Sequence, residues 1–306
     1  MWAARRLLLA LVSVWSAVTV SFVLMRLLPG DAISAQLIVS GASPEVIVER
    51  RAALGLDRPA VSQYIDYLWR LARGDLGESL VSGQPVSEIL AGRLSSTLAL
   101  TAGALLVAVP LGTALGLLTV KRGTVPGQIA WTLSSFAISL PPYWAGTLLL
   151  LVFVGQLRLL PAAHDGTAAG LILPAAALGF GSAGAVARVT AASAAAVYRA
   201  DFTRTAFGKG LRESSILLRH VLPASLTPVL SVIGLQTGYL LGGAVIVESI
   251  FTLPGLGRAV ISGVLEQDYP VVQGIVLWSA LAVTGVQLCA DALMWLCDPR
   301  LRETHQ

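Results

Sequence analysis

Six long apolar runs dominate this sequence, and each one could cross a lipid bilayer as a helix. A transmembrane helix needs about 20 predominantly apolar residues. Composition points the same way, because 55% of the 306 residues are hydrophobic and 12% are charged, too little polar surface to cover a water-soluble globule of this size. The sequence predicts an all-α integral membrane protein with six transmembrane helices, at roughly 7–28, 96–120, 127–155, 171–198, 225–250 and 271–297.

The charges between these runs predict the topology. The first run follows Arg5 and Arg6, is too long for the apolar region of a signal peptide and ends without a cleavage site, so we expect a retained helix. Six spans with this end inside place both termini in the cytoplasm. The segments then assigned to the inside hold eleven Lys and Arg against four Asp and Glu, as the positive-inside rule requires.

Three regions follow from this arrangement. Residues 1–28 form the first transmembrane helix, 29–95 an extracytoplasmic cap, and 96–302 a five-helix core with a cytoplasmic loop at 199–223. The cap is too short for an enzyme domain with a large core of its own. It is interpreted as a cover on the membrane bundle, with an unstructured solvated loop as the alternative.

Two helices are expected inside the cap. The first covers residues 44–54, and the second is an amphipathic run at 61–73 with Ile65, Leu68 and Leu71 on one face.

No pattern of residues predicts catalysis or metal binding. The sequence has no phosphate-binding loop, no H-E-x-x-H and no nucleophile elbow. The two cysteines, eight residues apart in the last run, form no metal motif, and the three histidines are far apart in the sequence. We expect no catalytic residue, no metal and no bound cofactor in this chain, so any nucleotide-driven step needs another chain. The residues in question are Cys289, Cys297, His164, His220 and His305.

The most informative hydrophilic stretch is the basic segment 203–223, between the fourth and fifth runs. Five of its 21 residues are Arg, Lys or His, against one acid, Glu213. A cationic, helix-prone loop held at the cytoplasmic face predicts a docking surface, although a loop that merely orients the spans would have the same charge.

This segment resembles the coupling loop of importer permeases of the ATP-binding cassette (ABC) superfamily, whose pattern is E-A-A-x3-G-x9-I-x-L-P. The residues at the corresponding positions are Arg204, Thr205, Ala206, Gly210, Leu222 and Pro223. The chain departs from the pattern at Arg204, in place of Glu, and at His220, in place of Ile. Arg-Thr-Ala-x3-Gly is, however, the usual form in the peptide and nickel branch.

The resemblance extends over almost the whole chain. Eight short segments, in order and at matching positions relative to the six runs, are similar to the dipeptide/oligopeptide permease family. They lie at 26–31, 54–59, 63–64, 74–77, 242–248, 254–258, 268–274 and 298–302.

The resemblance implies the permease fold of type I ABC importers and a set of partners. These are a second homologous permease subunit, two ATPase subunits that bind ATP and Mg, and an extracytoplasmic substrate-binding protein. The implied substrates are dipeptides or oligopeptides, with nickel chelates or other small solutes as the alternative. The implied contacts with the ATPase lie in the coupling loop, residues 199–223, at Arg204, Thr205, Ala206, Gly210, Leu211, Leu222 and Pro223, with Ile216 and Leu217 as further apolar contacts.

Several residues within the runs are candidates for a pore or gate. Gly234, Gly238 and Gly242 form a stripe of small residues that allows close helix approach, within the chain or across a pore. Glu248 lies near the outer end of its run, where it could act at a gate or as an anchor. Gln236 and Gln273 are uncharged polar groups that could line a hydrated path.

Two further expectations concern the spans. Asp291 and Arg188 could pair within the bundle, and Pro141-Pro142 must break or kink the third run. A different class, an ion-coupled secondary carrier that uses Glu248 or Asp291 as a proton relay, predicts inverted repeats with broken helices. No such repeat is visible in the sequence.

Overall fold

The computed structural model describes residues 2–27, 30, 32–39, 41–121, 123–163 and 166–297. Within these ranges every extended element is a helix, and the only strand-like pairing is one isolated bridge between Glu78 and Pro85, so the all-α class is confirmed. His164, the segment 298–302 and parts of the segment 26–31 lie outside the described residues.

In the part of the chain that the structure describes, four helices are long and apolar enough to cross a membrane, and two bent pairs bring the number to six if each pair is one span. The four are Arg5–Leu27, Val86–Thr119, Ala169–Tyr198 and Tyr269–Trp295, and the pairs are Val125–Ser139 with Pro142–Gln156 and Glu213–Ala224 with Leu226–Gly242. The second of these spanning helices, Val86–Thr119, begins ten residues before the expected start near residue 96, because polar residues of the cap extend it.

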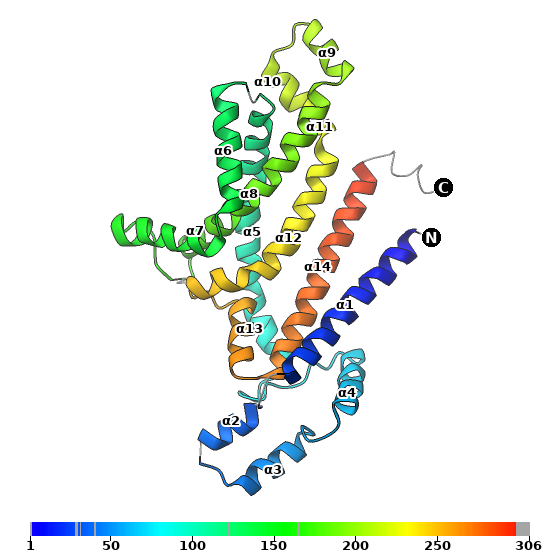
Figure 1. Ribbon diagram of the computed structural model, residues 1–306, viewed down its shortest axis with the longest axis vertical. Coiled ribbons are helices and arrows are strands. Elements are labelled where there is room, and N and C mark those ends of the chain that lie inside the picture. Colours follow the sequence, from blue (N-terminus) through cyan, green and yellow to red (C-terminus); the bar gives the residue numbers. More distant parts are fainter. Residues whose placement is uncertain are drawn as a thin grey trace. The chain divides into compact units, whose positions relative to one another are not determined.

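The chain divides into two compact units, and Figure 1 traces the helices of each. The first unit holds residues 3–96 and 254–281, and the second holds 97–253 with the chain from Ala282 onward. The first unit contains α1 (Trp2–Leu27), α2 (Ala32–Val39), α3 (Pro44–Ala53), α4 (Ala60–Ala72), the start of α5 (Val86–Thr119), α13 (Leu256–Leu265) and the start of α14 (Tyr269–Cys297).

In the first unit, α4 packs on α1 through aromatic side chains. The Phe22 ring of α1 stacks on Tyr67 with centroids 5.7 Å apart and meets Tyr64 edge-on at 5.0 Å. Leu68 and Leu71 join this cluster. The expectation that Ile65 shares the buried face with them is wrong, because Ile65 is 60% exposed and the packed face follows residues 64, 67, 68 and 71.

Side-chain hydrogen bonds hold two of the segments that carry the family resemblance to each other, and a third to the loop before α5. Asp268 is buried, at 3% exposure, and its carboxylate accepts hydrogen bonds from the Ser79 hydroxyl at 2.5 Å and the Leu80 backbone N–H at 3.1 Å. Arg26 donates to the Gln63 amide oxygen at 2.6 Å. Because charge-assisted bonds of this kind are directional, those to Asp268 fix the loop before α5 to the start of α14, and that from Arg26 fixes α1 to α4.

The second unit holds the remaining helices around α8. They are the rest of α5, then α6 (Val125–Ser139), α7 (Pro142–Leu149), η1 (Leu150–Gln156), α8 (Ala169–Tyr198), α9 (Asp201–Gly208), α10 (Glu213–Ile216), η2 (Leu217–Val221), α11 (Leu222–Ala224), α12 (Leu226–Ile250) and the end of α14.

Glycines let α5 and α8 approach closely. A Cβ added at Gly112 would lie 2.6 Å from the Ala183 carbonyl oxygen, and one at Gly116 would lie 2.5 Å from the Thr190 Cβ. At Gly179, on α8, the added atom would lie 2.6 Å from the Ala104 carbonyl oxygen. Without a hydrophobic force between helices in lipid, such close van der Waals contact is a main source of association.

The third apolar run breaks where the sequence predicted. α6 ends at Ser139, Leu140 is extended, and α7 starts at Pro142, so the two helices are bent by 103°. Neither Pro141 nor Pro142 has an N–H to donate to the carbonyls one turn earlier, which accounts for the end of α6.

Candidate functional site

The coupling loop forms a helical cap at one end of the second unit. It contains α9, α10, η2 and α11, which lie beyond the ends of α5, α6 and α8 (Figure 1). Its core contains Ala206 and Ile216, packed with Leu117 of α5 and Ala194 of α8. The loop is thus a folded element with an interior and a surface.

The inward face of α9 is made of small residues. Thr203 is fully buried and its hydroxyl donates to the Val197 carbonyl at 2.9 Å, while Ala206 is 5% exposed. The outward face carries Phe202 and Phe207, which are 50% and 38% exposed. The aromatic pair was missed in the sequence, because Phe202 and Phe207 are five residues apart, about 140° around a helix, and so do not mark a single apolar face.

These positions correct two expectations about the loop. Ala206 and Ile216 were expected to face a partner, but both are buried inside this chain. Leu211 remains available, at 41% exposure, and Leu218 is more exposed still, at 59%. The apolar surface of the loop therefore consists of Phe202, Phe207, Leu211 and Leu218.

Gly210 makes the turn between α9 and α10. Its φ is +75°, in the left-handed region where a side chain is strained, and nothing lies within 4 Å of an added Cβ. The constraint at this position is therefore the backbone angle and not lack of space, as expected from the motif.

The end of the loop is a wide helical turn. η2 is a π-helix that precedes Pro223, which has no N–H to offer the carbonyl of Arg219, and such bulges are frequent at functional sites. Leu222 is half-buried and Pro223 is exposed. Ser225, fully buried, accepts a hydrogen bond from Ser193 of α8 at its carbonyl, at 3.3 Å.

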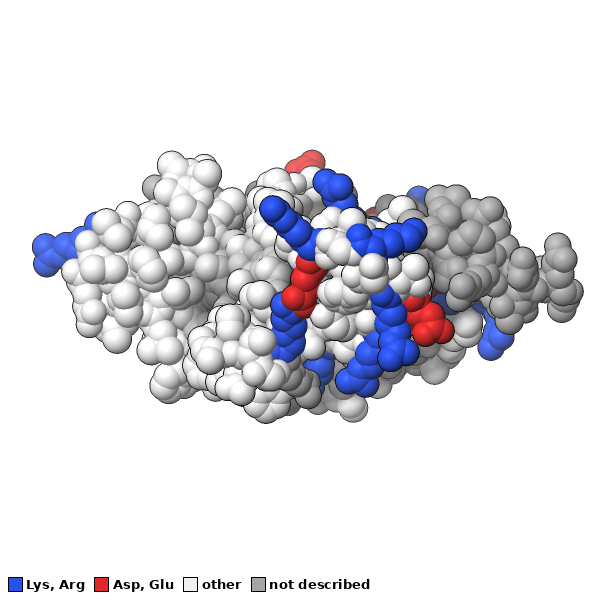
Figure 2. All heavy atoms as spheres, turned by 90° about the horizontal axis from the view of Figure 1, so that it is seen from above, with Lys and Arg blue, Asp and Glu red and all other residues white. Residues whose placement is uncertain are grey.

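Basic side chains surround this cap. Arg204 is 78% exposed and lies 3.9 Å from Asp201, a weak pair at such exposure. Figure 2 looks onto this end and shows Lys and Arg side chains gathered on it. Arg204 and Thr205 on α9 and Lys209, Arg212 and Arg219 further along the loop are all exposed.

One acidic residue of the coupling loop, Glu213, bonds to residues outside the loop. Glu213 pairs with Lys121 and accepts a hydrogen bond from the Tyr198 hydroxyl at 2.7 Å. The bond from Lys121, and next that from Tyr198, hold the pKa of the Glu213 carboxyl below its ordinary value. The carboxylate is therefore charged at neutral pH.

The pore candidates on α12 contact different neighbours. Gln236 donates to the Ser182 carbonyl of α8 at 3.5 Å, and a Cβ at Gly238 would lie 3.1 Å from Val283 of α14. Glu248 is fully buried and accepts a hydrogen bond from Thr97 of α5 at 2.6 Å. These three positions therefore face three other helices of the same unit.

The other candidates are placed separately. Gly242 is exposed and has nothing within 4 Å of an added Cβ. Gln273 belongs to the first unit, 5% exposed, and its amide nitrogen is buried without a hydrogen-bond partner. Arg188 is exposed and Asp291 is half-buried, and their pairing stays a prediction.

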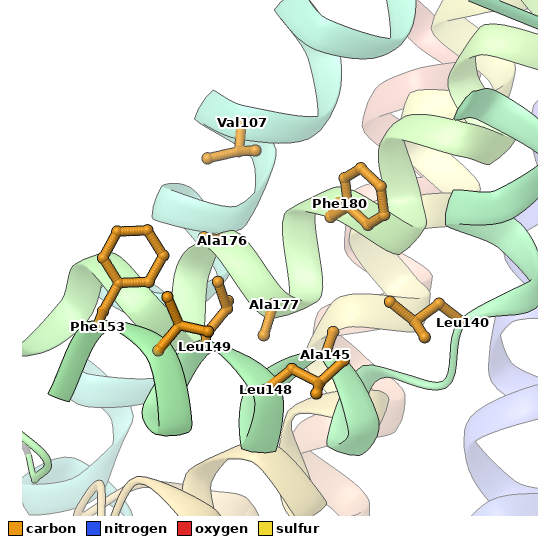
Figure 3. A pocket seen from close by; sticks show the side chains of 10 residues that line it. Val107, Leu140, Ala145, Leu148, Leu149, Phe153, Ala176, Ala177 and Phe180 are labelled. Atoms are coloured by element: carbon orange, nitrogen blue, oxygen red, sulfur yellow. The ribbon is translucent and has the colours of Figure 1, made fainter. Parts of the chain in front are cut away.

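A pocket of about 370 Å³ lies beside the broken third span, and Figure 3 shows side chains of α5, α7, η1 and α8 converging on it. Each of its lining residues is Ala, Val, Leu or Phe, among them Val107, Leu140, Phe153 and Phe180. Such a lining offers no partner to an amide or a carboxylate, so this pocket is unsuited to a polar cargo. Among the residues that the structure describes, no group of three or more His, Cys, Asp or Glu is arranged to hold a metal ion.

A bundle of membrane-spanning helices with a folded, cationic cap on one end defines a multi-pass transport component. The sequence model of the binding-protein-dependent transport system inner membrane component family matches residues 108–303. This chain belongs to that family, and it is a multi-pass inner membrane protein of an ABC import system and not an enzyme.

Individual relatives cover nearly the whole chain. It is 37% identical over 300 residues to a glutathione transport system permease protein of Pectobacterium atrosepticum, covering 97% of both chains. It is also 37% identical over 292 residues, 92% of both chains, to a protein of Brucella abortus named provisionally as a peptide transport system permease protein.

Solved structures show the same fold. A chain of the MetNI methionine ABC transporter, in an inward-facing conformation, aligns with a TM-score of 0.59 over 69% of this chain and 97% of that one, at 14% identity. At that identity the likeness concerns the fold alone.

Proposed function

We propose that this chain is the permease subunit of an importer for small peptides, including glutathione-like peptides. The observation that carries the proposal is 37% identity over 97% of the length of a permease named for glutathione, with a provisional peptide permease at the same identity. In this arrangement an extracytoplasmic binding protein selects the substrate, and this chain forms part of the path through the membrane.

The coupling loop is the docking site for an ATPase subunit. Its exposed apolar side chains, Phe202, Phe207, Leu211 and Leu218, belong to a loop that also exposes the cations Arg204, Lys209, Arg212 and Arg219, a combination suited to an apolar cleft with acidic margins. Arg204, Thr205, Gly210, Leu222 and Pro223 belong to this site, whereas Ala206 supports it from inside. Two ATPase subunits bind ATP and Mg, and a second permease subunit completes the path.

This function fixes an orientation. The loop faces the cytoplasm, and an even number of spans then puts both termini there too. A reporter enzyme active only in the cytoplasm, fused to the C-terminus, should be active; a reporter active only outside should be silent. The reverse result would contradict both the orientation and the docking site.

Gly210→Asp tests the docking site in the complete transporter, reconstituted with its partner permease, ATPases and binding protein. The variant places a side chain at a φ of +75° and adds charge to the turn, so substrate uptake and stimulation of ATP hydrolysis should both be lost. Gly41→Asp is the matched control, because Gly41 also has a positive φ, +76°, and nothing within 4 Å of an added Cβ, and it lies outside the coupling loop. Normal uptake by Gly210→Asp would refute the docking site.

The substrate class needs a separate measurement. Dipeptides, glutathione and nickel chelates are added in turn to the cognate binding protein, and the shift of its melting temperature is recorded. A shift with peptides or glutathione supports the proposal, and a shift with nickel chelates alone overturns the peptide assignment but keeps the importer.

A further inference from the structure

Glu213, at the start of α10, connects three parts of the second unit that are far apart in the sequence. Its carboxylate pairs with Lys121 and accepts from the Tyr198 hydroxyl at 2.7 Å. Lys121 lies in the turn after α5, which leads to α6, and Tyr198 is the last residue of α8. One side chain of the coupling loop thus meets both the α5–α6 turn and α8.

Both partners of Glu213 are themselves held in place. The Lys121 carbonyl accepts from the Thr124 hydroxyl at 2.9 Å, and that hydroxyl in turn caps α6 by accepting from the Gly127 N–H at 3.3 Å. The Tyr198 ring meets Phe207 of α9 edge-on, with centroids 5.5 Å apart. Glu213 therefore bonds to two residues that are themselves fixed, Lys121 through its backbone and Tyr198 through its ring.

The rest of the loop is attached by contacts of a different kind. Ala206, Ile216 and Val221 pack against Leu117 and Ala194 in an apolar cluster, and apolar contact is non-directional. The Glu213 bonds are directional. The side chains of Lys121 and Glu213 are 38% and 33% exposed, an exposure at which an ion pair contributes little to stability, so their main effect is on position.

We propose that Lys121, Glu213 and Tyr198 form a joint that carries movement of the coupling loop to the α5–α6 turn as well as to α8. The joint rests on the proposed function, since it transmits a displacement that the ATPase subunits impose. Without it, the loop would still act on α8 and on the end of α5 through Thr203 and the apolar cluster, but the α5–α6 turn and α6 would lose their directional tie to the loop and follow it less closely. Lys121, Glu213 and Tyr198 are positioning residues and need not touch either ATP or substrate.

The test uses charge reversal in the complete reconstituted transporter. Lys121→Glu and Glu213→Lys each put like charges together, and the double variant restores an opposite pair. The readout is the number of ATP molecules hydrolysed per substrate molecule imported. Each single variant should raise this ratio about fivefold, the scale of losing one hydrogen bond to a charged, partly exposed group, and the double variant should return it to within about twofold of wild type.

Two more variants separate position from folding. Tyr198→Phe keeps the ring against Phe207 and removes only the hydroxyl, so it should raise the ratio with unchanged assembly. Asp66→Asn removes the acid of an exposed ion pair with Arg58 outside the joint and should leave the ratio unchanged. Assembly is checked by co-purification of the ATPase subunits with each variant.

The outcomes distinguish the joint from the docking site. If Gly210→Asp blocks uptake while Lys121→Glu, Glu213→Lys and Tyr198→Phe all keep the wild-type ratio, the joint is wrong and the docking site stands. A double reversal that is no better than the single variants, with the complex intact, also overturns the joint. If Gly210→Asp imports normally, the docking site itself fails, whatever the reversals do.

Discussion

Replacing Gly116 by alanine should force α5 and α8 apart. The new Cβ would lie 2.5 Å from the Thr190 Cβ and 2.8 Å from the Ala187 carbonyl oxygen, whereas carbon atoms in good contact are about 3.5–4.0 Å apart. Neither neighbour can rotate away, because one is a β-carbon and the other belongs to the backbone. The two helices would have to separate by about 1 Å to recover normal contact distances.

The expected cost follows from two opposing effects. Overpacking of this kind costs about 1–3 kcal/mol, and the better helix propensity of alanine returns at most about 1 kcal/mol. Gly116→Ala should therefore be about 1–3 kcal/mol less stable than a glycine-to-alanine substitution that gains the propensity alone. Gly285→Ala is the matched control, because Gly285 also lies within a helix and has nothing within 4 Å of an added Cβ, so only the gain in propensity remains.

Thermal unfolding of the purified protein in one detergent, at one scan rate, measures the difference. The control should melt at or slightly above the wild-type temperature, and Gly116→Ala should melt several degrees lower, at about 2–4 °C per kcal/mol. Gly112→Ala should behave like Gly116→Ala, since its added Cβ would lie 2.6 Å from a backbone oxygen. Equal melting of Gly116→Ala and the control would refute the close approach of these helices.

Three other substitutions test buried polar groups. Burial raises the pKa of Tyr67 to about 12, and its hydroxyl has no hydrogen-bond partner. Tyr67→Phe should thus raise the free energy of unfolding by about 1 kcal/mol at neutral pH, and the melting temperature with it. The wild type binds this proton more tightly when folded, so it loses further stability between pH 10 and 12, and a constant difference from the variant across that window would contradict the burial. In Asp268→Asn an amide N–H₂ replaces one of the carboxylate oxygens that accept from Ser79 and Leu80. The free energy of unfolding should fall by about 2 kcal/mol, and proteolysis of the loop before α5 should become faster. Unchanged cleavage of that loop would count against this anchor. Thr97→Val removes the donor to buried Glu248 and should cost about 1–3 kcal/mol in a melting experiment, while Thr97→Ser should match the wild type.

Hydropathy predicted the spans well but not their ends. Apolar runs report where a helix can sit in lipid, and they say nothing of a helix that continues into water. α5 therefore begins at Val86, in a polar stretch that contains Glu88 and Arg93, although its apolar run starts near residue 96. Pro141-Pro142 predicted the break in the third run because proline chemistry is local, but the bend of 103° depends on contacts with other helices.

The faces of short helices were harder to predict. On α4 the aliphatic residues suggested the wrong stripe, because Tyr64 and Tyr67 supply much of the buried surface and tyrosine reads as polar in a simple pattern. On α9 a partner-facing role was expected for Ala206 because of its motif position. Its small side chain serves close packing inside the chain instead.

The joint at Glu213 could not be predicted from the sequence at all. Lys121 and Glu213 are 92 residues apart in the chain, and a single sequence gives no information about which distant charges meet. The positive-inside rule predicts that both residues lie on the same side of the membrane, but it does not predict that they are in contact.

Helix α12 packs closely against α14 and therefore cannot move on its own. An added Cβ at Gly234 would lie 2.7 Å from the Ala290 Cβ, and one at Gly238 would lie 3.1 Å from Val283. Side chains of α14 in the same unit therefore fill the space beside two glycines of the predicted stripe. Gly242 alone is open. Because packed helices resist sliding against each other, any displacement of α12 moves the adjoining part of α14 as well.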